Sequence, residues 1–470
     1  MWTQRDQVQA AQFLRRRLVS ALVSADPNHP VSPVRRAVLG TALGLAALLL
    51  VSGVVGVVGL LRPGSAGNWR QGGQVIVEKE TGARFVLGED GALHPVLNYA
   101  SARLLAGGDG KRTVTLSAKA LADAPRGAAL GIPDAPDSVP DSSRLLAGSW
   151  VSCTRRSRDQ PHDAEPTSTV LLGHSVGGDQ LAPGQGLVVG LGTGARFLVT
   201  EGRRHLLPDN RAITALGYAS TTPLPVSSAW LNTVPVGRDL GVVAVAGSGS
   251  AGPTVGGVAT RVGQVLVSTG ADGTEVFYVV RREGLAVVTE TEASLVLGSP
   301  SAAAAYGDAV PRPVPVTALD VPTIARPHSG DEGEYPPRRP TPTRVADDTT
   351  VCATDIETGR TKILVGAAVP GGDHAKPIRV TQPSPRTATE VYVPGGAGAL
   401  VAEQPAPGVG VGGVHLLTDT GSRYPVPGEE AVKSLGYGGV TPKPVPSTLL
   451  ALFPSGPALD PARARRAVSG

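Results

Sequence analysis

One long stretch without a charged residue, 37–61, constrains this chain more than any other feature. Arg35 and Arg36 precede it and Arg62 follows it. As a helix the stretch would be roughly 37 Å long, which is enough to cross a hydrocarbon core of about 30 Å with some tilt. We therefore predict a single transmembrane helix over 37–61. A cleaved signal peptide is the alternative, although its apolar region would be much shorter.

The charges on either side of this stretch predict its orientation. Residues 1–36 contain six arginines and two aspartates. Positive charge favours the cytoplasmic side, so the N-terminus should be cytoplasmic and everything from Arg62 onward extracytoplasmic. Of the 43 Lys and Arg and 39 Asp and Glu in the chain, 37 of each lie beyond residue 61. This exterior part has no net charge and therefore lacks the excess positive charge typical of proteins that bind nucleic acid.

Composition predicts the fold class of the exterior part. The chain contains 61 Gly and 42 Pro, whereas only 4% of its residues are aromatic. Many short strands joined by turns fit this composition better than long helices do. We predict a mainly β fold with short helices, of the α+β class, following the transmembrane helix.

The only two cysteines, Cys153 and Cys352, both lie in the predicted exterior part. An oxidising compartment permits a disulfide between them. Closing so large a loop would contribute up to about 4 to 5 kcal/mol in the chain-entropy model. We predict this disulfide; two unrelated buried thiols are the alternative.

A repeated motif indicates internal repeats. A Tyr is followed after four residues by Pro, one further residue and Pro-Val, and this pattern begins at Tyr218, Tyr306 and Tyr437. A leucine stands six residues after the second proline of each copy: Leu231, Leu319 and Leu450. Leu231 and Leu450 either help to hold neighbouring copies of the chain together or belong to an internal core. Strand-like runs with Gly turns precede each motif, so each unit should be a small antiparallel sheet, a helical turn and a proline-stiffened exit.

A fourth, diverged copy over 74–107 shares the sequence GARF with 194–197. We thus predict four repeats around a central domain made of two separate pieces, each with one cysteine. The predicted segments are 1–36, 37–61, 62–119 (repeat 1), 120–185 (central), 186–246 (repeat 2), 258–324 (repeat 3), 325–390 (central), 391–457 (repeat 4) and 458–470. Pro- and Gly-rich stretches at 247–257 and 327–343 suggest exposed linkers.

An apolar stripe marks the N-terminal segment. Ala11, Leu14, Leu18, Ala21 and Ala25 follow one another at spacings of three and four, which place them on one face of a helix. Such a helix either lies on membrane lipid or docks on a partner helix. We expect a partner, because a segment this short cannot bury a core by itself.

Motifs for catalysis and cofactors are weak. Gly173–Gly177 matches the G-x-S-x-G elbow around Ser175, but the following Gly and Pro leave no room for the helix that this elbow requires. The G-x-G-x-x-G matches at 247–252 and 408–413 are not followed by a helix signal either. No Walker motif occurs, and the eight histidines are scattered. We therefore expect no enzyme activity, cofactor or metal.

Four segments together resemble the EccB family of type VII secretion proteins: 7–23 (QVQAAQFLRRRLVSALV), 93–107, 124–140 and 149–153 (SWVSC). The resemblance covers nearly the whole chain. It implies a single-pass protein of the cytoplasmic membrane, a disulfide matching the two cysteines, partners of the EccC, EccD and EccE kinds, and a role in exporting small helical substrates. ATP hydrolysis is attributed to some members, but no nucleotide motif is found here. Gln9, Ala10 and Ala25 depart from the family pattern, which affects the expected cytoplasmic contacts.

These observations predict a structural subunit that anchors and assembles a secretion machine and associates with further copies of itself. A membrane-anchored module that binds cell wall and an extracytoplasmic hydrolase are the two alternatives from other classes.

Overall fold

The computed structural model describes residues 3–25, 33–61, 69–108, 111–161, 164–321, 326–327, 335–369, 376–381, 383–406 and 408–468. They form two compact units. The first consists of Met1–Gln71 with Leu116–Asp123, and the second of Gly72–Thr115 with Ala124–Gly470.

The first unit is helical. Helix α1 spans Gln4–Ser24 and begins with a capping box, in which the carboxylate of Asp6 accepts a hydrogen bond from the backbone N–H of Thr3 at 3.0 Å. Helix α2 spans Pro33–Leu61. In the described residues, no helix combines the length and the apolar content needed to cross a membrane.

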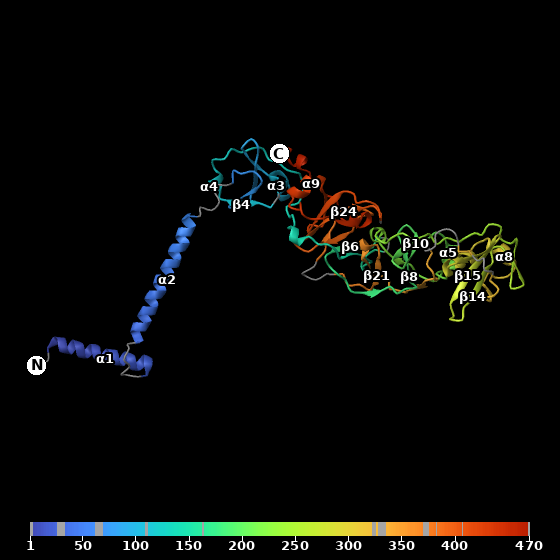
Figure 1. Cartoon of the computed structure of the whole chain (residues 1–470), viewed down its shortest axis with the longest axis horizontal. Helices are drawn as coiled ribbons and strands as arrows, with labels where there is room; N and C mark the ends of the chain where they lie inside the picture. Colours follow the sequence, from blue (N-terminus) through green and yellow to red (C-terminus); the bar gives the residue numbers. More distant parts are fainter. Residues whose placement is uncertain are drawn as a thin grey trace. The chain divides into compact units, whose positions relative to one another are not determined.

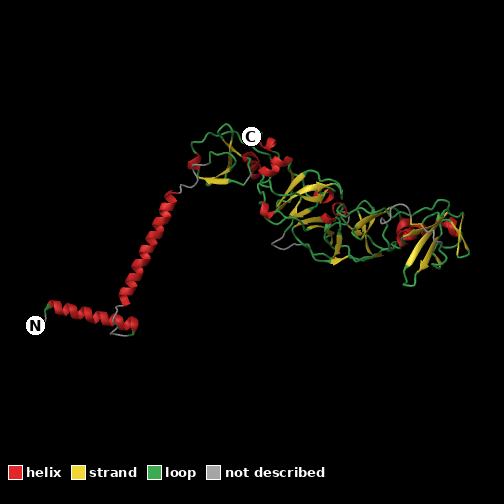
Figure 2. Cartoon of the chain, viewed as in Figure 1, coloured by secondary structure: helices red, strands yellow, loops and turns green. Residues whose placement is uncertain are grey.

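The second unit contains several small sheets, and the chain as a whole has a mixed α+β fold, as the sequence predicts at this level (Figure 2). Four sheets share one connectivity. Three strands form an antiparallel meander, a helix follows, and a last strand lies beside the first. We call these units repeats 1 to 4.

The members of each repeat are as follows, in chain order. Repeat 1 has β1 (Val75–Glu78), β2 (Arg84–Leu87), β3 (Leu93–Pro95), α3 (Tyr99–Ala106) and β4 (Thr113–Leu116). Repeat 2 has β8 (Gln185–Gly190), β9 (Arg196–Thr200), β10 (Arg203–Leu207), α5 (Asn210–Ala215), β11 (Leu224–Pro225) and α6 (Ser228–Leu231). Repeat 3 has β14 (Val265–Thr269), β15 (Glu275–Arg281), β16 (Gly284–Val288), α7 (Glu290–Leu297), α8 (Ala302–Tyr306) and β17 (Val314–Val316). Repeat 4 has β24 (Gly398–Gln404), β25 (Val414–Thr418), β26 (Arg423–Pro425), α9 (Gly428–Ser434), β27 (Lys443–Pro446) and α10 (Ser447–Leu450).

The second proline of the motif lies in the last strand of repeats 2 and 4 and directly before that strand in repeat 3. In repeats 2, 3 and 4 this strand pairs in parallel with the first strand, at the edge of the meander. Proline is tolerated there because an edge strand need not donate to a neighbour on its outer side. The parallel return also explains the helix before it, since parallel strands need a crossover connection.

A Pro-x-Gly segment closes three of the repeats. Beyond the last strand, the backbone N–H of the glycine in this segment donates to a carbonyl of the third strand, from Gly127 to Leu93, Gly237 to Arg204 and Gly456 to Arg423. In repeat 2 the ring of His205 occupies the space where a side chain on Gly237 would lie, so this position needs glycine.

A seven-stranded sheet joins the two segments that resemble no repeat. Its order is β22 (Ile378–Arg379), β23 (Glu390–Tyr392), β6 (Thr167–Leu172), β5 (Trp150–Arg155), β20 (Val351–Thr354), β21 (Lys362–Val365) and β7 (Asp179–Gln180). Strands β5 and β20 are antiparallel neighbours although they lie far apart in the sequence. We call this the central sheet.

The prediction of an exposed linker over 247–257 is wrong from Ala251 onward. Strands β12 (Ala251–Val255) and β13 (Val258–Arg261) form a hairpin around Gly256 and Gly257, whose φ values are 56° and 78°. Two adjacent glycines suit the left-handed backbone of such a turn. Of the second predicted linker, 328–334 lies outside the described residues, whereas β19 (Thr341–Pro342) pairs with β8.

Candidate functional site

The central sheet carries the disulfide. Cys153 on β5 and Cys352 on β20 are directly opposite each other, and their Sγ atoms are 2.06 Å apart. Both cysteines are buried, with Val151, Leu171 and Ala367 in the same cluster. The bond therefore joins the two pieces of the central sheet at its middle and confirms the predicted pairing.

The leucines of repeats 2 and 4 belong to one core with the central sheet. Leu231 of α6 and Leu450 of α10 are both 0% exposed and lie in the same cluster as Trp150 of β5. The ring of Phe453, just beyond α10, meets that of Trp150 edge-on with centroids 5.9 Å apart. These two leucines are internal core, which resolves the alternative left open by the sequence. Leu319 differs, since it is 97% exposed.

In repeats 2 and 4 the tyrosine of the motif binds a segment that precedes a strand of the central sheet. The hydroxyl of Tyr218 in repeat 2 donates to the carbonyl of Pro340 at 2.6 Å, and that of Tyr437 in repeat 4 donates to the carbonyl of Pro140, also at 2.6 Å. Both phenols are buried, and burial raises the pKa of each well above its usual value. The two tyrosines thus remain neutral hydrogen-bond donors. Each binds a segment that leads into the central sheet.

Small residues make room for these segments. A side chain on Gly186 would bring its Cβ to 3.0 Å from Pro340 Cβ, and one on Gly398 would lie 2.8 Å from Pro140 Cγ. Both contacts are closer than van der Waals packing allows. At the matching place in the sequence, directly before the apolar run of the first strand, repeats 1 and 3 have Gln74 and Gln264. In repeat 3 the hydroxyl of Tyr306 instead accepts a hydrogen bond from the N–H of Val265 at 2.9 Å.

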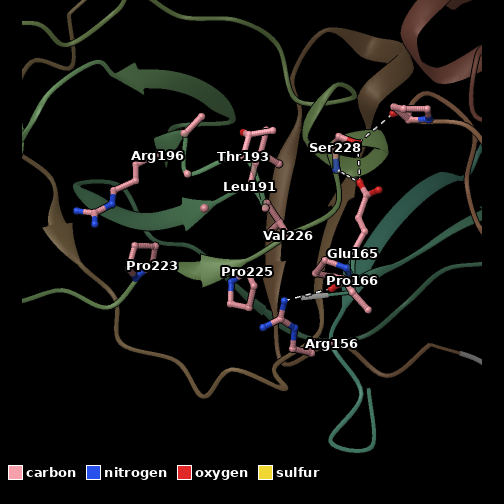
Figure 3. Close-up of a pocket in the computed structure, with 16 residues that line it drawn as sticks. Arg156, Glu165, Pro166, Leu191, Thr193, Arg196, Pro223, Pro225, Val226 and Ser228 are labelled. Atoms are coloured by element: carbon pink, nitrogen blue, oxygen red, sulfur yellow. Dashed lines mark hydrogen bonds between the residues drawn. The ribbon is translucent and has the colours of Figure 1, made fainter. Parts of the chain in front are cut away.

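A groove of about 680 Å³ lies between the loop before β6 and the first turn of repeat 2 (Figure 3). On one wall, Glu165 accepts hydrogen bonds from the N–H and the hydroxyl of Ser228 at 2.8 and 2.6 Å. Arg156 donates to the carbonyl of Ala164 at 3.3 Å. Much of the remaining lining consists of proline and glycine, and no histidine is among the lining residues.

The motifs that suggest enzymes lie in loops or separate sheets. Ser175 is exposed in the loop between β6 and β7, with no helix after it. His205 and His415 are buried in repeats 2 and 4, and burial lowers the pKa of each. In the described residues, no group of three or more His, Cys, Asp or Glu side chains could hold a metal.

The stripe on α1 is uncovered. Leu14 and Leu18 are 62% and 61% exposed, and Ala11 and Ala21 are exposed as well. Further apolar side chains on α1 are also exposed: Val8, Phe13 and Leu22. Partner binding through this helix remains a prediction.

Comparison with known proteins decides the family. The family model described as type VII secretion system ESX-1, transport TM domain B, matches residues 1–470. The chain belongs to the EccB family. It is 30% identical to the ESX-3 secretion system ATPase EccB3 of Mycolicibacterium smegmatis, over 97% of this chain and 89% of that protein. It is 29% identical to the ESX-2 secretion system ATPase EccB2 of Mycobacterium tuberculosis, over 97% and 93%.

Solved structures agree with this EccB assignment. A chain of an intact ESX-5 inner membrane complex superposes with a TM-score of 0.67 at 25% identity, over 100% of this chain and 96% of that one. A chain of the periplasmic assembly from the ESX-5 complex gives 0.62 at 25% identity, over 86% and 97%. An EccB3 dimer from the ESX-3 core complex gives 0.66 at 23% identity, over 84% and 100%, which shows the shared fold alone.

Sequence reasoning found the tyrosine repeat but missed what the tyrosines bind. Pro140 and Pro340 lie in segments without internal similarity, so no repeat pattern pointed to them. The signal that could have found them is the pair of glycines, Gly186 and Gly398, which distinguishes repeats 2 and 4 from repeats 1 and 3.

Proposed function

We propose that this chain is a structural subunit of a type VII secretion inner-membrane complex, which it anchors and assembles through its extracytoplasmic domain. The observation that carries this proposal is the family match over the entire chain. The relatives whose structures superpose on it come from ESX inner membrane complexes. The partners we propose are the other core subunits of such a complex and further copies of this chain.

In this proposal α2 crosses the membrane through residues 37–61, with the N-terminus in the cytoplasm. The uncharged sequence of this stretch and the arginines before it support that orientation. The disulfide fits an oxidising exterior. Reporter fusions at both ends test the topology, and cytoplasmic activity of a fusion after Gly470 would contradict it.

We propose further that the chain assembles the complex without catalysing a reaction, although curated relatives carry the name ATPase. The sequence has no Walker motif to bind a nucleotide. ATP turnover by the purified full chain tests this point. Turnover that persists at constant specific activity through successive purification steps would overturn it.

The assembly role is tested by purifying the tagged full chain from native membranes and identifying the subunits that accompany it. We expect Leu18→Asp to release subunits that bind on the cytoplasmic side, because a charge would interrupt the exposed apolar stripe of α1. Gln12→Asp adds the same charge on a face of α1 away from the stripe and should release none. If the wild-type chain brought no secretion subunit with it, the proposal would fail.

A further inference from the structure

Arg156 and Arg196 both line the groove beside repeat 2, where β6 of the central sheet and β8 of repeat 2 share a core (Figure 1). Neither guanidinium forms an ion pair with an acidic side chain in the described part of the chain. Glu165 is the only acidic residue in the lining, and its Oε1 atom accepts two hydrogen bonds from Ser228. The groove therefore carries an excess of positive charge.

The guanidinium of Arg156 is held by a single long hydrogen bond. Its Nη2 atom donates to the carbonyl of Ala164 at 3.3 Å, and its buried Nε atom has no hydrogen-bond partner among the described residues. A guanidinium binds carboxylates well because its N–H donors lie in one plane and can contact both oxygens. The described residues thus leave most donors of Arg156 for a bound anion.

The surface between the two arginines is apolar. Figure 3 draws Pro223 and Pro225 between them, and Leu191 and Val226 also line the groove. A free phosphate or a sugar would gain little from such a surface, whereas a peptide can bury apolar side chains on it. Proline rings are rigid, so they lose little conformational entropy when a partner covers them. The lining therefore fits a peptide that carries both a carboxylate and an apolar side chain.

Repeat 4 also packs on the central sheet, but it lacks the two arginines. Counted from the paired cysteines, Arg156 corresponds to Asp355, which forms an ion pair with Lys362 at 2.8 Å. Arg196 is the first residue of β9 and corresponds to Val414, the first residue of β25. The fold that the repeats share therefore requires neither arginine.

We propose that this groove binds an acidic peptide segment of a different subunit of the complex. A carboxylate of the segment contacts Arg156 or Arg196, and a neighbouring apolar side chain lies on Pro223 and Pro225. The inference rests on the proposed function, since it names the chemistry of one contact within the proposed assembly. Because charge contributes to this contact, salt should weaken it.

Photo-cross-linking in the native membrane complex tests this contact. The full chain carries p-benzoylphenylalanine in place of Thr193, which lines the groove and is exposed. We expect light to join it to one other subunit, through a segment in which Asp or Glu stands beside an apolar residue. Mass spectrometry of the joined peptides identifies that segment. The same probe in place of Ala271, an exposed residue in the first turn of repeat 3, is the control and should not capture it.

The arginines are tested in the same assay. Arg156→Gln with Arg196→Gln should reduce the cross-linked product about tenfold or more, because charge-assisted hydrogen bonds to the carboxylate are lost. Arg155→Gln removes the same charge from an exposed neighbour outside the lining and should retain the product. Arg156→Glu should lose the product, and arginine in place of the acid of the captured segment should restore it. This restoration would also show that the Arg156→Glu chain is folded.

The remaining outcomes decide against the contact. Product that is unchanged by the double arginine variant, or a captured segment without an acidic residue, would overturn it. Capture of cell-wall glycan or of a second copy of this chain, in place of another subunit, would overturn it as well. If the other subunits co-purify but Thr193 gives no more product than Ala271, the contact is wrong while the assembly role stands. If no secretion subunit co-purifies with the wild-type chain, both proposals fail.

Discussion

Repeats 2 and 3 contain the same motif, but its tyrosine and its leucine have different environments in the two repeats. In repeat 2 the tyrosine holds a segment of the central sheet, and Leu231 is buried in the shared core. In repeat 3 the tyrosine binds the backbone of its own first strand, and Leu319 is exposed. Repeat 4 agrees with repeat 2 in both respects.

The difference teaches that the surroundings of a repeat decide what its motif does. The meander, the helix and the proline-bearing last strand form in both repeats because local pattern and crossover geometry specify them. The fate of the leucine depends on whether a sheet lies beside it. In repeats 2 and 4 the central sheet is this neighbour, whereas in repeat 3 Leu319 is exposed.

The largest expected effect concerns the disulfide on which the central sheet depends. Cys153→Ser with Cys352→Ser should lower the free energy of unfolding by about 4 kcal/mol, because the loop between the cysteines is long. Hydrogen exchange should accelerate in β5, β20 and the parts of repeats 2 and 4 packed on them, more than in repeat 3. Equal acceleration in repeat 3 would show that all repeats depend on the centre alike.

Alanine at the repeat leucines gives the sharpest comparison. Leu231→Ala and Leu450→Ala should each cost about 3 kcal/mol of unfolding free energy, since each leaves a cavity in a packed core. Leu319→Ala should change it by less than about 0.5 kcal/mol, because an exposed side chain loses little. Denaturant unfolding measures all three. A cost for Leu319→Ala equal to the other two would break the comparison.

These two predictions also mark what the sequence can and cannot show. The repeats, the pairing of Cys153 with Cys352 and the α+β class follow from motif, spacing and composition, which are local properties. The burial of Leu231 and the exposure of Leu319 do not, because both leucines occupy the same place in the same motif. The β12–β13 hairpin was missed for a related reason. Its Gly-Gly turn has the same composition as a flexible linker, and only the pairing of its flanking residues distinguishes the two.

The tyrosines should show a smaller difference. Tyr437→Phe and Tyr218→Phe each remove a hydrogen bond to a proline carbonyl and should cost about 2 kcal/mol, since the carbonyl then lacks a partner in a buried site. Tyr306→Phe removes a bond within repeat 3 only. Proteolysis after each substitution should expose the segments around Pro140 and Pro340 in the first two variants and leave them protected in the third. Protection in all three would mean that the tyrosines do not hold these segments.

The smallest expected effect is the part of the pH dependence that comes from the buried histidines of repeats 2 and 4. Burial lowers the pKa of His205 and His415 in the folded state, whereas the unfolded value is about 6.5. Below pH 6.5 the unfolded chain binds protons that the folded chain does not. The free energy of unfolding should therefore decrease as the pH is lowered, until the pH reaches the folded-state pKa. Unfolding measured between pH 7.5 and 5 checks this, with His205→Gln as the comparison. If the unfolding free energy of the variant changed with pH as steeply as that of the wild type, His205 would not contribute to the pH dependence.

The central claim is that the extracytoplasmic domain assembles a secretion complex without catalysis. Its most direct test measures complex assembly and substrate export together in cells that lack their own copy of the chain. We predict that a chain ending after Leu61 loses both and that Ser175→Ala retains both, because Ser175 lies in an exposed loop. Full assembly and export by the shortened chain would contradict the account, and so would a Ser175→Ala chain that assembles the complex but exports nothing.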